Sequence, residues 1–390
     1  MEHGDKKQIL FVIDSLSCGG AEKSLVSLLP LLDYTQMEVD LMLIACGGVF
    51  ERYVPQEVQV IPFPKVKGYH KLWCFISLLY FSFLLRYFRV LKKNRHGAEI
   101  HWMAKKSVYA PLRKHYDVAV AYQQGFPTYY VAKKVDADKK YAWINVDLCK
   151  AGYDESFNRH FYDTMNRIVL VSDVLCKMLS ETGYVDKLKL HTVYDILNVN
   201  LMRQMAKEKG FSDDLPCGCV RIVTAGRMAP PKNYPLAVET AKRLKEMGLV
   251  FRWYFVGDGS ERLAVENLIA QYHLQENVVL LGMQPNPYPY MANCDIYVQT
   301  SSFEGFCLTL REARIFHKPV VSTNFPVVYN QIRDGENGLI AEMTAESLSE
   351  KIMMIVNNKE LKEQLIANTQ KEIDLTAVTE SRKVNDLLLV

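Results

Sequence analysis

Gln8-Ile-Leu-Phe-Val-Ile13, followed by the loop Asp14–Gly20 and the stretch Ala21–Leu32, decides the fold. The first run is apolar throughout instead of alternating, which predicts a strand of a parallel sheet covered on both faces. The loop contains glycine, and the stretch after it predicts a helix. A strand, a glycine loop and a helix in this order form the first unit of a doubly wound α/β domain.

The same alternation continues through the first half and starts again in the second. The further strands expected in the first half are Val39–Ala45, Val58–Ile61, Asp117–Ala121, Tyr141–Asn145 and Ile168–Val171. Those expected in the second half are Val220–Thr224, Val250–Val256, Val278–Leu281, Asp295–Gln299, Pro319–Ser322 and Gly338–Ala341. The helices expected there are Asn233–Gly248, Ser260–Tyr272 and Gly305–Phe316. Two such halves predict two Rossmann-like domains facing across a cleft, because open parallel sheets bind ligands beyond the carboxyl ends of their strands.

The length of 390 residues agrees with two domains, since a single core rarely grows so large. Tyr194–Asn200 and then the polar stretch Lys207–Gly218 lie between the halves and mark the boundary. We therefore expect one domain at residues 1–200 and a second at 201–375. Residues 376–390 are expected to form a helix that returns to the first domain.

Composition excludes several classes of protein. A hydrophobic content of 49% and a net charge of +3 are ordinary for a soluble protein and do not indicate a nucleic-acid partner. The nine cysteines are irregularly spaced and no secretory signal precedes them, which favours free thiols in the cytoplasm. Cys217-Gly-Cys219 lacks a second ligand pair for zinc. Asp136-Ala-Asp138 is expected to be solvated in a polar loop, so no metal site is predicted.

Two glutamates of the second half, Glu304 and Glu312, are eight positions apart. A helix beginning near Gly305 would place the first in the loop at its mouth and the second about two turns along. Unpaired amides of Gly305, Phe306 and Cys307, together with the helix dipole, would make a diphosphate site. The alternative is an ordinary helix N-terminus with an acidic first turn.

The surroundings of this pair favour the diphosphate site. Gly226-Arg227 follows a strand, and Lys232 comes just before a helix, so two cations lie at one strand-to-helix turn. They could neutralise the two phosphates of a nucleotide, although most Arg and Lys side chains are simply solvated. Val256-Gly-Asp-Gly259 is a second glycine-rich turn of this kind, which could also be merely a tight turn.

Six segments together resemble family-four retaining glycosyltransferases of the GT-B type, especially the branch that builds bacterial capsular, exopolysaccharide or lipopolysaccharide chains. The resemblance covers most of Val220–Ile340 and is looser in the first half. It implies a GT-B architecture with an acceptor-binding first domain and a donor-binding second domain. The segments are Gly226-Arg-Met…Lys232-Asn, Val256-Gly-Asp-Gly259, Leu281-Gly282, Asp295–Ser302, Phe303-Glu-Gly-Phe306…Glu312-Ala313 and Lys318-Pro-Val-Val321.

The resemblance also implies roles for single residues. Arg227 and Lys232 would hold the donor diphosphate, Glu304 would bond hydroxyls of the transferred sugar, and Glu312 would bond the ribose. Backbone groups complete the donor site, with Gly282 and Met283 next to the base. The other backbone groups belong to Gly226, Gly257, Gly305, Phe306, Cys307 and Leu308. Arg311 stands where the family is usually apolar, and Cys307 where it is usually small.

The first half carries fewer matched positions. The resemblance places the loop with Gly19 and Gly20 over the donor diphosphate, whereas the simpler interpretation is a flexible first turn. Tyr141–Asp147 resembles a segment that often carries His where Asn145 stands. Asn145 can hydrogen-bond but cannot act as a proton-transfer base. Asp147 either orients the acceptor or caps a turn.

Leu72–Leu85 is the most apolar segment, and Arg86, Arg89, Lys92, Lys93 and Arg95 follow it. It is shorter than the roughly 20 residues needed to span a bilayer. It is therefore either a buried helix with a basic end or an interfacial helix attracted to anionic lipid. Since acceptors in the resembled family are often lipid-linked, peripheral contact with the inner face of the cell membrane is expected.

The predicted function is transfer of a hexose, with retention, from a nucleotide-diphosphate sugar, preferably a UDP-sugar, to a hydroxyl of a glycan or lipid-linked acceptor in cell-surface polysaccharide synthesis. No cofactor and no metal are expected, since protein groups stabilise the leaving diphosphate. One alternative is a sugar-nucleotide epimerase or hydrolase on the same scaffold. Another is a non-catalytic nucleotide-sugar-binding partner of an assembly complex, which Asn145 keeps open. A dinucleotide dehydrogenase is disfavoured because Ser17-Cys-Gly-Gly lacks its glycine fingerprint.

Overall fold

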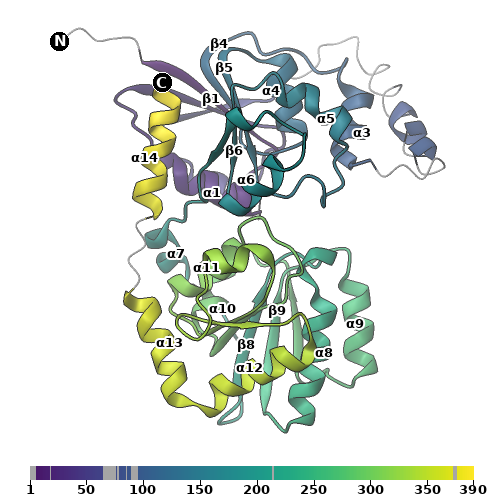
Figure 1. Cartoon of the computed structure of the whole chain (residues 1–390), viewed down its shortest axis with the longest axis vertical. Helices are drawn as coiled ribbons and strands as arrows, with labels where there is room; N and C mark the ends of the chain where they lie inside the picture. Colours follow the sequence, from purple (N-terminus) through teal and green to yellow (C-terminus); the bar gives the residue numbers. More distant parts are fainter. Residues whose placement is uncertain are drawn as a thin grey trace. The chain divides into compact units, whose positions relative to one another are not determined.

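The computed structural model of the chain describes residues 6–17, 19–64, 76, 79–84, 86–88, 95–212, 215–371 and 376–390. The chain divides into two compact units (Figure 1). Unit 1 is Met1–Leu197 together with Leu375–Val390, and unit 2 is Asn198–Asp374. Each unit contains one parallel sheet with helices around it, so the predicted pair of α/β domains is confirmed.

Unit 1 has a seven-stranded sheet in the order β3-β2-β1-β4-β5-β6-β7. The first apolar run of the sequence forms β1, an interior strand between β2 and β4, and the last five residues of β1 are buried. The strands are β1 (Lys7–Ile13), β2 (Met37–Leu43), β3 (Val58–Pro62), β4 (His115–Ala121), β5 (Asp136–Ile144), β6 (Arg167–Leu170) and β7 (Leu190–Thr192). The sequence did not predict β7, because three residues are too few to show a periodic pattern.

The described helices of unit 1 are α1 (Gly20–Leu28), α3 (Gly97–Lys105), α4 (Phe126–Lys134), α5 (Glu155–Tyr162), α6 (Asp173–Ser180) and α14 (Thr376–Leu389). Two predictions need correction. The first helix ends at Leu28 and continues only as a 3₁₀ turn, since Pro30 has no amide to donate. The predicted polar loop at Asp136–Asp138 is wrong, because these residues begin β5, where they pair with β4.

Helix α14 packs on unit 1 although it ends the chain (Figure 1). The Asn385 side chain accepts a hydrogen bond from the Asp33 amide at 2.9 Å and donates one to the Leu31 carbonyl at 3.0 Å. The hydroxyl of Tyr141 donates to the Leu387 carbonyl at 3.2 Å. The last helix therefore joins the loop after α1 to strand β5.

Unit 2 has a six-stranded sheet in the order β10-β9-β8-β11-β12-β13. The chain runs outward from β8 to β10 and then returns to add β11 on the other side of β8. The carboxyl ends of β8 and β11 thus form a topological switch point, where open α/β sheets bind ligands. The strands are β8 (Val220–Ala225), β9 (Phe251–Val256), β10 (Val278–Gly282), β11 (Ile296–Gln299), β12 (Val320–Thr323) and β13 (Leu339–Ala341).

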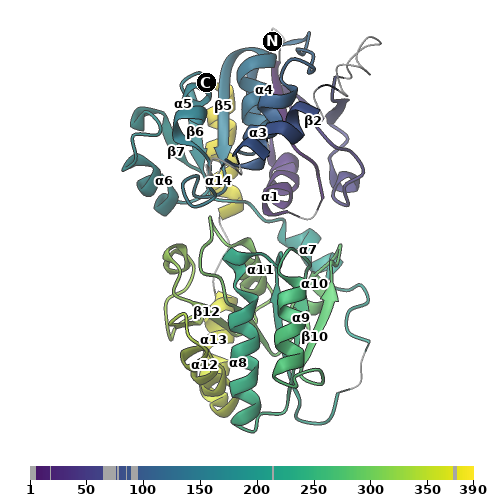
Figure 2. The ribbon, with the colours of Figure 1, turned by 90° about the vertical axis from the view of Figure 1, so that its right-hand side faces the viewer.

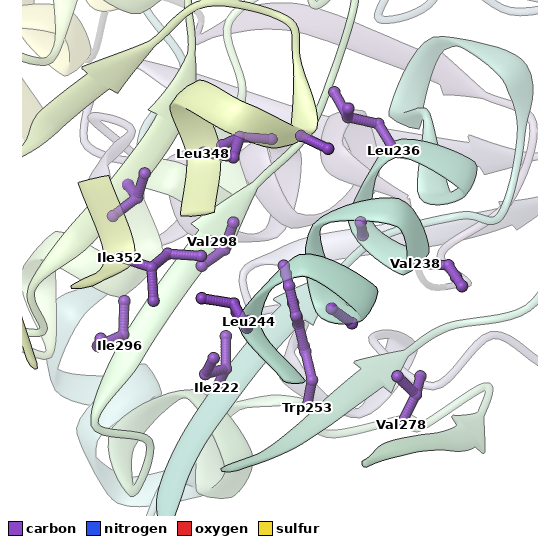
Figure 3. Close-up of a cluster of buried hydrophobic side chains, with 14 of the residues drawn as sticks. Ile222, Leu236, Val238, Leu244, Trp253, Val278, Ile296, Val298, Leu348 and Ile352 are labelled. Atoms are coloured by element: carbon purple, nitrogen blue, oxygen red, sulfur yellow. The ribbon is translucent and has the colours of Figure 1, made fainter. Parts of the chain in front are cut away.

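The helices of unit 2 surround this sheet, and Figure 2 shows α8 and α9 side by side. They are α7 (Val199–Met205), α8 (Tyr234–Glu246), α9 (Arg262–Gln271), α10 (Tyr288–Ala292), α11 (Leu308–Ile315), α12 (Ala345–Asn357) and α13 (Lys359–Lys371). Helices α8 and α12 pack against each other and bury their apolar faces over the strands. Trp253, which is completely buried, lies in that core beside Leu244 and Ile222 (Figure 3). Dense packing of this kind holds the strand ends in place.

Candidate functional site

The candidate site begins with an ion pair at the switch point of unit 2. Lys232 ends a 3₁₀ turn after β8, and Glu304 lies in the loop after β11. Lys232 Nζ lies 2.5 Å from Glu304 Oε1. The structure therefore brings together two residues that are 72 positions apart and that the sequence predicted to share one site.

The ion pair is largely shielded from solvent. The side chain of Glu304 is 11% exposed and that of Lys232 is 21% exposed. Burial alone would lower the pKa of Lys232, but the Glu304 carboxylate outweighs burial, so the pKa lies above its ordinary value. Lys232 is therefore charged over the ordinary range of pH.

Arg227 adds a second positive charge beside this pair. It is exposed, and it forms no ion pair with any residue that the structure describes. It lies close enough to Lys232 for its charge to oppose that of the lysine. An anion with two charges could therefore meet both cations, one held by Glu304 and one open to solvent.

Three glycine turns at neighbouring strand ends form one wall of the site. Gly226 and Gly257 directly follow β8 and β9, and Gly282 is the last residue of β10. The Gly257 amide donates to the Gly282 carbonyl at 2.9 Å. A Cβ atom on Gly257 would lie only 1.9 Å from the Gly226 carbonyl oxygen, so no side chain fits there. Met283, next in sequence, is 67% exposed and leaves the backbone at this strand end near solvent.

The helix after Glu304 starts later than the sequence predicted. Helix α11 begins at Leu308 rather than near Gly305. Cys307 adopts a left-handed conformation with φ 66° and ψ 64°, which interrupts the helix. The Gln331 side chain donates to the carbonyl groups of Phe306 and Cys307. The three positions from Gly305 to Cys307 are therefore a buried loop that leads into the helix.

Glu312 lies in the middle of α11 and is completely buried. Its Oε1 accepts a hydrogen bond from the Tyr288 hydroxyl at 3.1 Å. Tyr288 begins α10, a short helix that the sequence did not predict. A ribose hydroxyl could reach this carboxylate only after a local rearrangement, so the predicted ribose contact stays a prediction.

Unit 1 carries the remaining predicted residues. Gly19 and Gly20 stand at the start of α1, and the Glu22 carboxylate fills the space where a side chain on Gly19 would lie. The backbone amide of Asn145 donates a hydrogen bond to Gln124 Oε1 at 3.1 Å, and this contact joins the loops that follow β5 and β4. Asn145 Oδ1 is buried and accepts no hydrogen bond from the described residues.

Asp147 caps a turn, which is one of the two roles considered for it. Its Oδ1 accepts hydrogen bonds from the amides of Cys149 at 2.9 Å and Lys150 at 3.1 Å. Asp14, at the end of β1, was not singled out from the sequence. Burial, with a smaller contribution from Glu22, raises the pKa of Asp14 to about 6. Perturbed carboxylates of this kind are frequent at functional sites.

Sequence reasoning also missed polar residues that support Glu304. Ser301 Oγ donates to Glu304 Oε1 at 2.6 Å, and Gln299 Nε2 donates to it at 3.2 Å. The available signal was the alternation of Tyr297, Gln299 and Ser301, which lie on one face of a strand and its continuation. Such alternation in a strand of a buried parallel sheet indicates a polar network.

The apolar segment at 72–85 is only partly described. Leu84 is buried and packs with Phe81 and Phe88 against α3. A second set of side chains is exposed: Ile76 by 44%, Leu79 by 56%, Tyr80 by 47% and Phe83 by 59%. Of the basic residues that follow, Arg89, Lys92 and Lys93 lie outside the described residues. Every helix in the part of the chain that the structure describes is too short or too polar to cross a membrane.

Metal ligands do not gather in the described regions. No group of three or more His, Cys, Asp or Glu residues there could hold a metal ion. Neither Cys217 nor Cys219 forms a disulfide bond with a residue that the structure describes.

One part of the chain matches a protein family: residues 215–372 fit the model of glycosyl transferases group 1. The poly(ribitol-phosphate) alpha-N-acetylglucosaminyltransferase of Staphylococcus aureus (strain COL) is 27% identical over 209 residues, which are 52% of this chain and 41% of that protein. The N-acetylgalactosamine-N,N'-diacetylbacillosaminyl-diphospho-undecaprenol 4-alpha-N-acetylgalactosaminyltransferase of Campylobacter jejuni is 31% identical over 161 residues, 41% of this chain and 42% of that protein. The matched part spans less than half the length of either relative.

A solved structure covers nearly the whole chain. Anabaena Alr3699/HepE in complex with UDP-glucose aligns with a TM-score of 0.68 at 16% identity, over 98% of this chain and 99% of that chain. At this identity the likeness concerns the fold alone. The GT-B class of fold predicted from the sequence is confirmed, and the resemblance drawn from the motifs is confirmed for the second unit.

Proposed function

Residues 215–372 are a glycosyltransferase group 1 domain, and from this premise we propose that the protein transfers a hexose, with retention and without a metal, from a UDP-sugar. The acceptor is a hydroxyl of a glycan or lipid-linked glycan in the synthesis of a bacterial surface polysaccharide. The names of the two relatives, both N-acetylhexosaminyltransferases, support this class of reaction. The UDP-glucose complex of a protein with the same fold supports the donor.

The observation that carries the proposal is the ion pair of Lys232 and Glu304 at the switch point, with Arg227 beside it. Two cations suit a diphosphate, whereas a carboxylate suits the hydroxyls of a sugar. The glycine wall of Gly226, Gly257 and Gly282 allows backbone groups to approach the nucleotide closely. The diphosphate and the sugar of the donor thus each have a matching group within unit 2.

In the proposed reaction the bond between the sugar C1 and the diphosphate oxygen breaks, and a bond forms between C1 and the acceptor oxygen on the same face. The acceptor proton passes to the departing phosphate. Lys232 and Arg227 stabilise the negative charge that develops on the leaving group. No side chain needs to remove a proton in this scheme, so Asn145 is compatible with it.

The test is donor binding followed by product analysis. Thermal shift with UDP-, GDP-, ADP- and TDP-sugars should select UDP-sugars, since a ligand that binds the folded state stabilises it. Arg227→Ala and Glu304→Ala should each lower transfer by a factor on the order of 100 to 1000. Unchanged transfer in both variants would refute the proposed site, and an inverted anomeric product would refute retention.

Asn145 supports a second candidate, a nucleotide-sugar-binding partner without transfer activity. Its buried Oδ1 has no hydrogen bond from described residues, so it could bind ligand without moving a proton. This candidate predicts donor binding without transfer to any cell-envelope acceptor. Rapid formation of an epimer or of free sugar would instead favour an epimerase or hydrolase.

Contact with a membrane surface is the last part of the proposal. The exposed side chains of Ile76, Leu79, Tyr80 and Phe83 supply an apolar face for the lipid boundary. Phe83→Asp should lower co-sedimentation with vesicles that contain anionic lipid. Leu263→Asp changes a similarly exposed side chain on α9 and serves as the control. Equal binding by both variants would refute attachment through this face.

A further inference from the structure

Gln299 is the centre of a buried hydrogen-bond network beneath the ion pair. It is the last residue of β11 and is 1% exposed. Its Oε1 accepts hydrogen bonds from the Tyr297 hydroxyl at 2.7 Å and from Thr309 Oγ1 at 3.2 Å. Its Nε2 donates to Ser301 Oγ at 2.7 Å and to Glu304 Oε1 at 3.2 Å. An amide side chain has two acceptor and two donor positions, so this one is fully used.

The chemistry of the neighbours determines which way the Gln299 amide points. In the reverse orientation the amide oxygen would face the Glu304 carboxylate, and two negative ends would meet inside the protein. In the observed orientation the amide hydrogens face the carboxylate. Tyr297 and Ser301 are completely buried, so water does not compete for these contacts. The network therefore has one stable arrangement.

In this arrangement the two carboxylate oxygens of Glu304 accept different numbers of hydrogen bonds. Oε1 accepts from three donors, Lys232, Ser301 and Gln299. Oε2 accepts a hydrogen bond from no residue within the described ranges, and this oxygen remains accessible to solvent. The network thus fixes one oxygen and leaves the other for a ligand.

We infer that Gln299 is a positioning residue, which holds Glu304 so that its Oε2 accepts a hydroxyl of the transferred sugar. The inference rests on the proposed function, in which Glu304 binds that sugar. Gln299 suits the task because it donates to the carboxylate without adding a charge that would compete with Lys232. It acts on the sugar of the donor and not on the nucleotide.

The test uses this separation between sugar and nucleotide. The full-length chain is titrated by calorimetry with UDP and with UDP-glucose or UDP-N-acetylglucosamine, whichever the wild type binds more tightly. Gln299→Leu should weaken UDP-sugar binding about tenfold, because the loss of one orienting hydrogen bond lowers affinity by about this factor. The same substitution should leave UDP binding within about twofold of the wild type. A loss of general stability would weaken both ligands alike.

A matched control deletes a buried hydroxyl elsewhere in unit 2. Thr240 is completely buried on α8 and donates to the Leu236 carbonyl at 2.7 Å. Thr240→Val should leave both affinities unchanged. If Gln299→Leu does not fold, Thr309→Val removes one of the two hydrogen bonds to Gln299 Oε1 and should weaken the UDP-sugar selectively.

Gln299→Glu gives a readout that a purely structural role would not produce. The new carboxyl group, when protonated, can donate to Ser301 and Glu304 as the amide does. When it ionises, it repels Glu304. UDP-sugar affinity of this variant should therefore fall as the pH rises, more steeply than that of the wild type or Gln299→Leu, whereas UDP affinity should not.

The outcomes separate the inference from the proposed function. If the wild type binds none of these nucleotides, the proposed function fails. If the wild type binds them and Gln299→Leu changes the affinities for UDP and the UDP-sugar equally, or changes neither, the role of Gln299 is overturned. A selective loss for the UDP-sugar together with the pH dependence of Gln299→Glu supports it.

Discussion

At the scale of single residues, Cys307 shows how the site departs from ordinary backbone geometry. It is 4% exposed and has φ 66°, a conformation that costs an L-residue about 1 kcal/mol or more relative to glycine. Cys307→Gly should therefore change the free energy of unfolding by less than about 1 kcal/mol, because relief of strain offsets the lost thiol contacts. Cys307→Val should destabilise by about 2 kcal/mol, because a β-branched residue tolerates this region poorly.

Urea denaturation measures the free energy of unfolding of both Cys307 variants. Cys294 is the matched control, since it is equally buried but has ordinary backbone angles. Cys294→Val should cost less than Cys307→Val. Equal losses at the two positions would contradict a conformational cause.

Asp14 gives the protein a pH-dependent stability. Its pKa is raised from 3.8 to about 6, mainly by burial and further by Glu22. Between these values the folded state keeps the proton that the unfolded state has lost, so the free energy of unfolding falls as the pH rises. The variant Asp14→Asn lacks this pH-dependent loss of stability. The difference in free energy of unfolding between Asp14→Asn and wild type should therefore increase by about 2 to 3 kcal/mol from about pH 4 to about pH 7.

Thermal unfolding over this pH range tests the effect of Asp14. Asp386→Asn, at an exposed position on α14, is the control and should follow the wild type at every pH. A constant difference between Asp14→Asn and wild type would show that Asp14 titrates alike in both states.

At the scale of elements, the stacked glycine turns depend on the absence of a side chain at Gly257. A Cβ there would lie 1.9 Å from a backbone oxygen, which cannot move without shifting the end of β8. Gly257→Ala should therefore destabilise unit 2 by about 3 kcal/mol or more and weaken nucleotide binding. Gly248 has φ 80° but no atom near its added Cβ, so Gly248→Ala reports the conformational cost alone.

Denaturation of the two glycine variants, followed by nucleotide titration, separates clash from strain. Only Gly257→Ala should lose affinity as well as stability. If both variants lose the same free energy and both bind normally, the turns do not shape the site.

The elements also show what the sequence could predict. The long apolar runs Gln8–Ile13 and Val220–Thr224 form interior strands of their sheets, as predicted. A strand that is buried on both faces is apolar at every position, so its sequence alone identifies it. The start of α11 was wrong, because the left-handed Cys307 and its Gln331 contact depend on residues distant in sequence. The sequence predicted that Lys232 and Glu304 share one site, because each follows a strand of the same sheet, but their direct ion pair is a finding of the structure. The hydrogen bond from Gln299 to Glu304 depends on the register of β11 and on the loop beyond it, which a local pattern does not reveal.

At the scale of the whole molecule, the end of the chain belongs to the unit that begins it. Val384 and Leu388 of α14 are completely buried, and α14 is part of unit 1. The Lys7 side chain also donates to the Leu389 carbonyl at 2.5 Å. The stability of unit 1 therefore depends on residues that follow the whole of unit 2 in the sequence.

Leu388→Ala should destabilise unit 1 by about 2 to 5 kcal/mol, the usual cost of such a cavity. Hydrogen exchange should then speed up in β1 and β5 of unit 1, while β8 and β9 of unit 2 keep their protection, because local opening follows the cooperative unit that was weakened. Val378 lies on the same helix but is 57% exposed, so Val378→Ala should leave both units unchanged. If Leu388→Ala lowers protection from hydrogen exchange equally in both units, the two units unfold as one cooperative body. In that case α14 stabilises the entire chain rather than only the unit on which it packs.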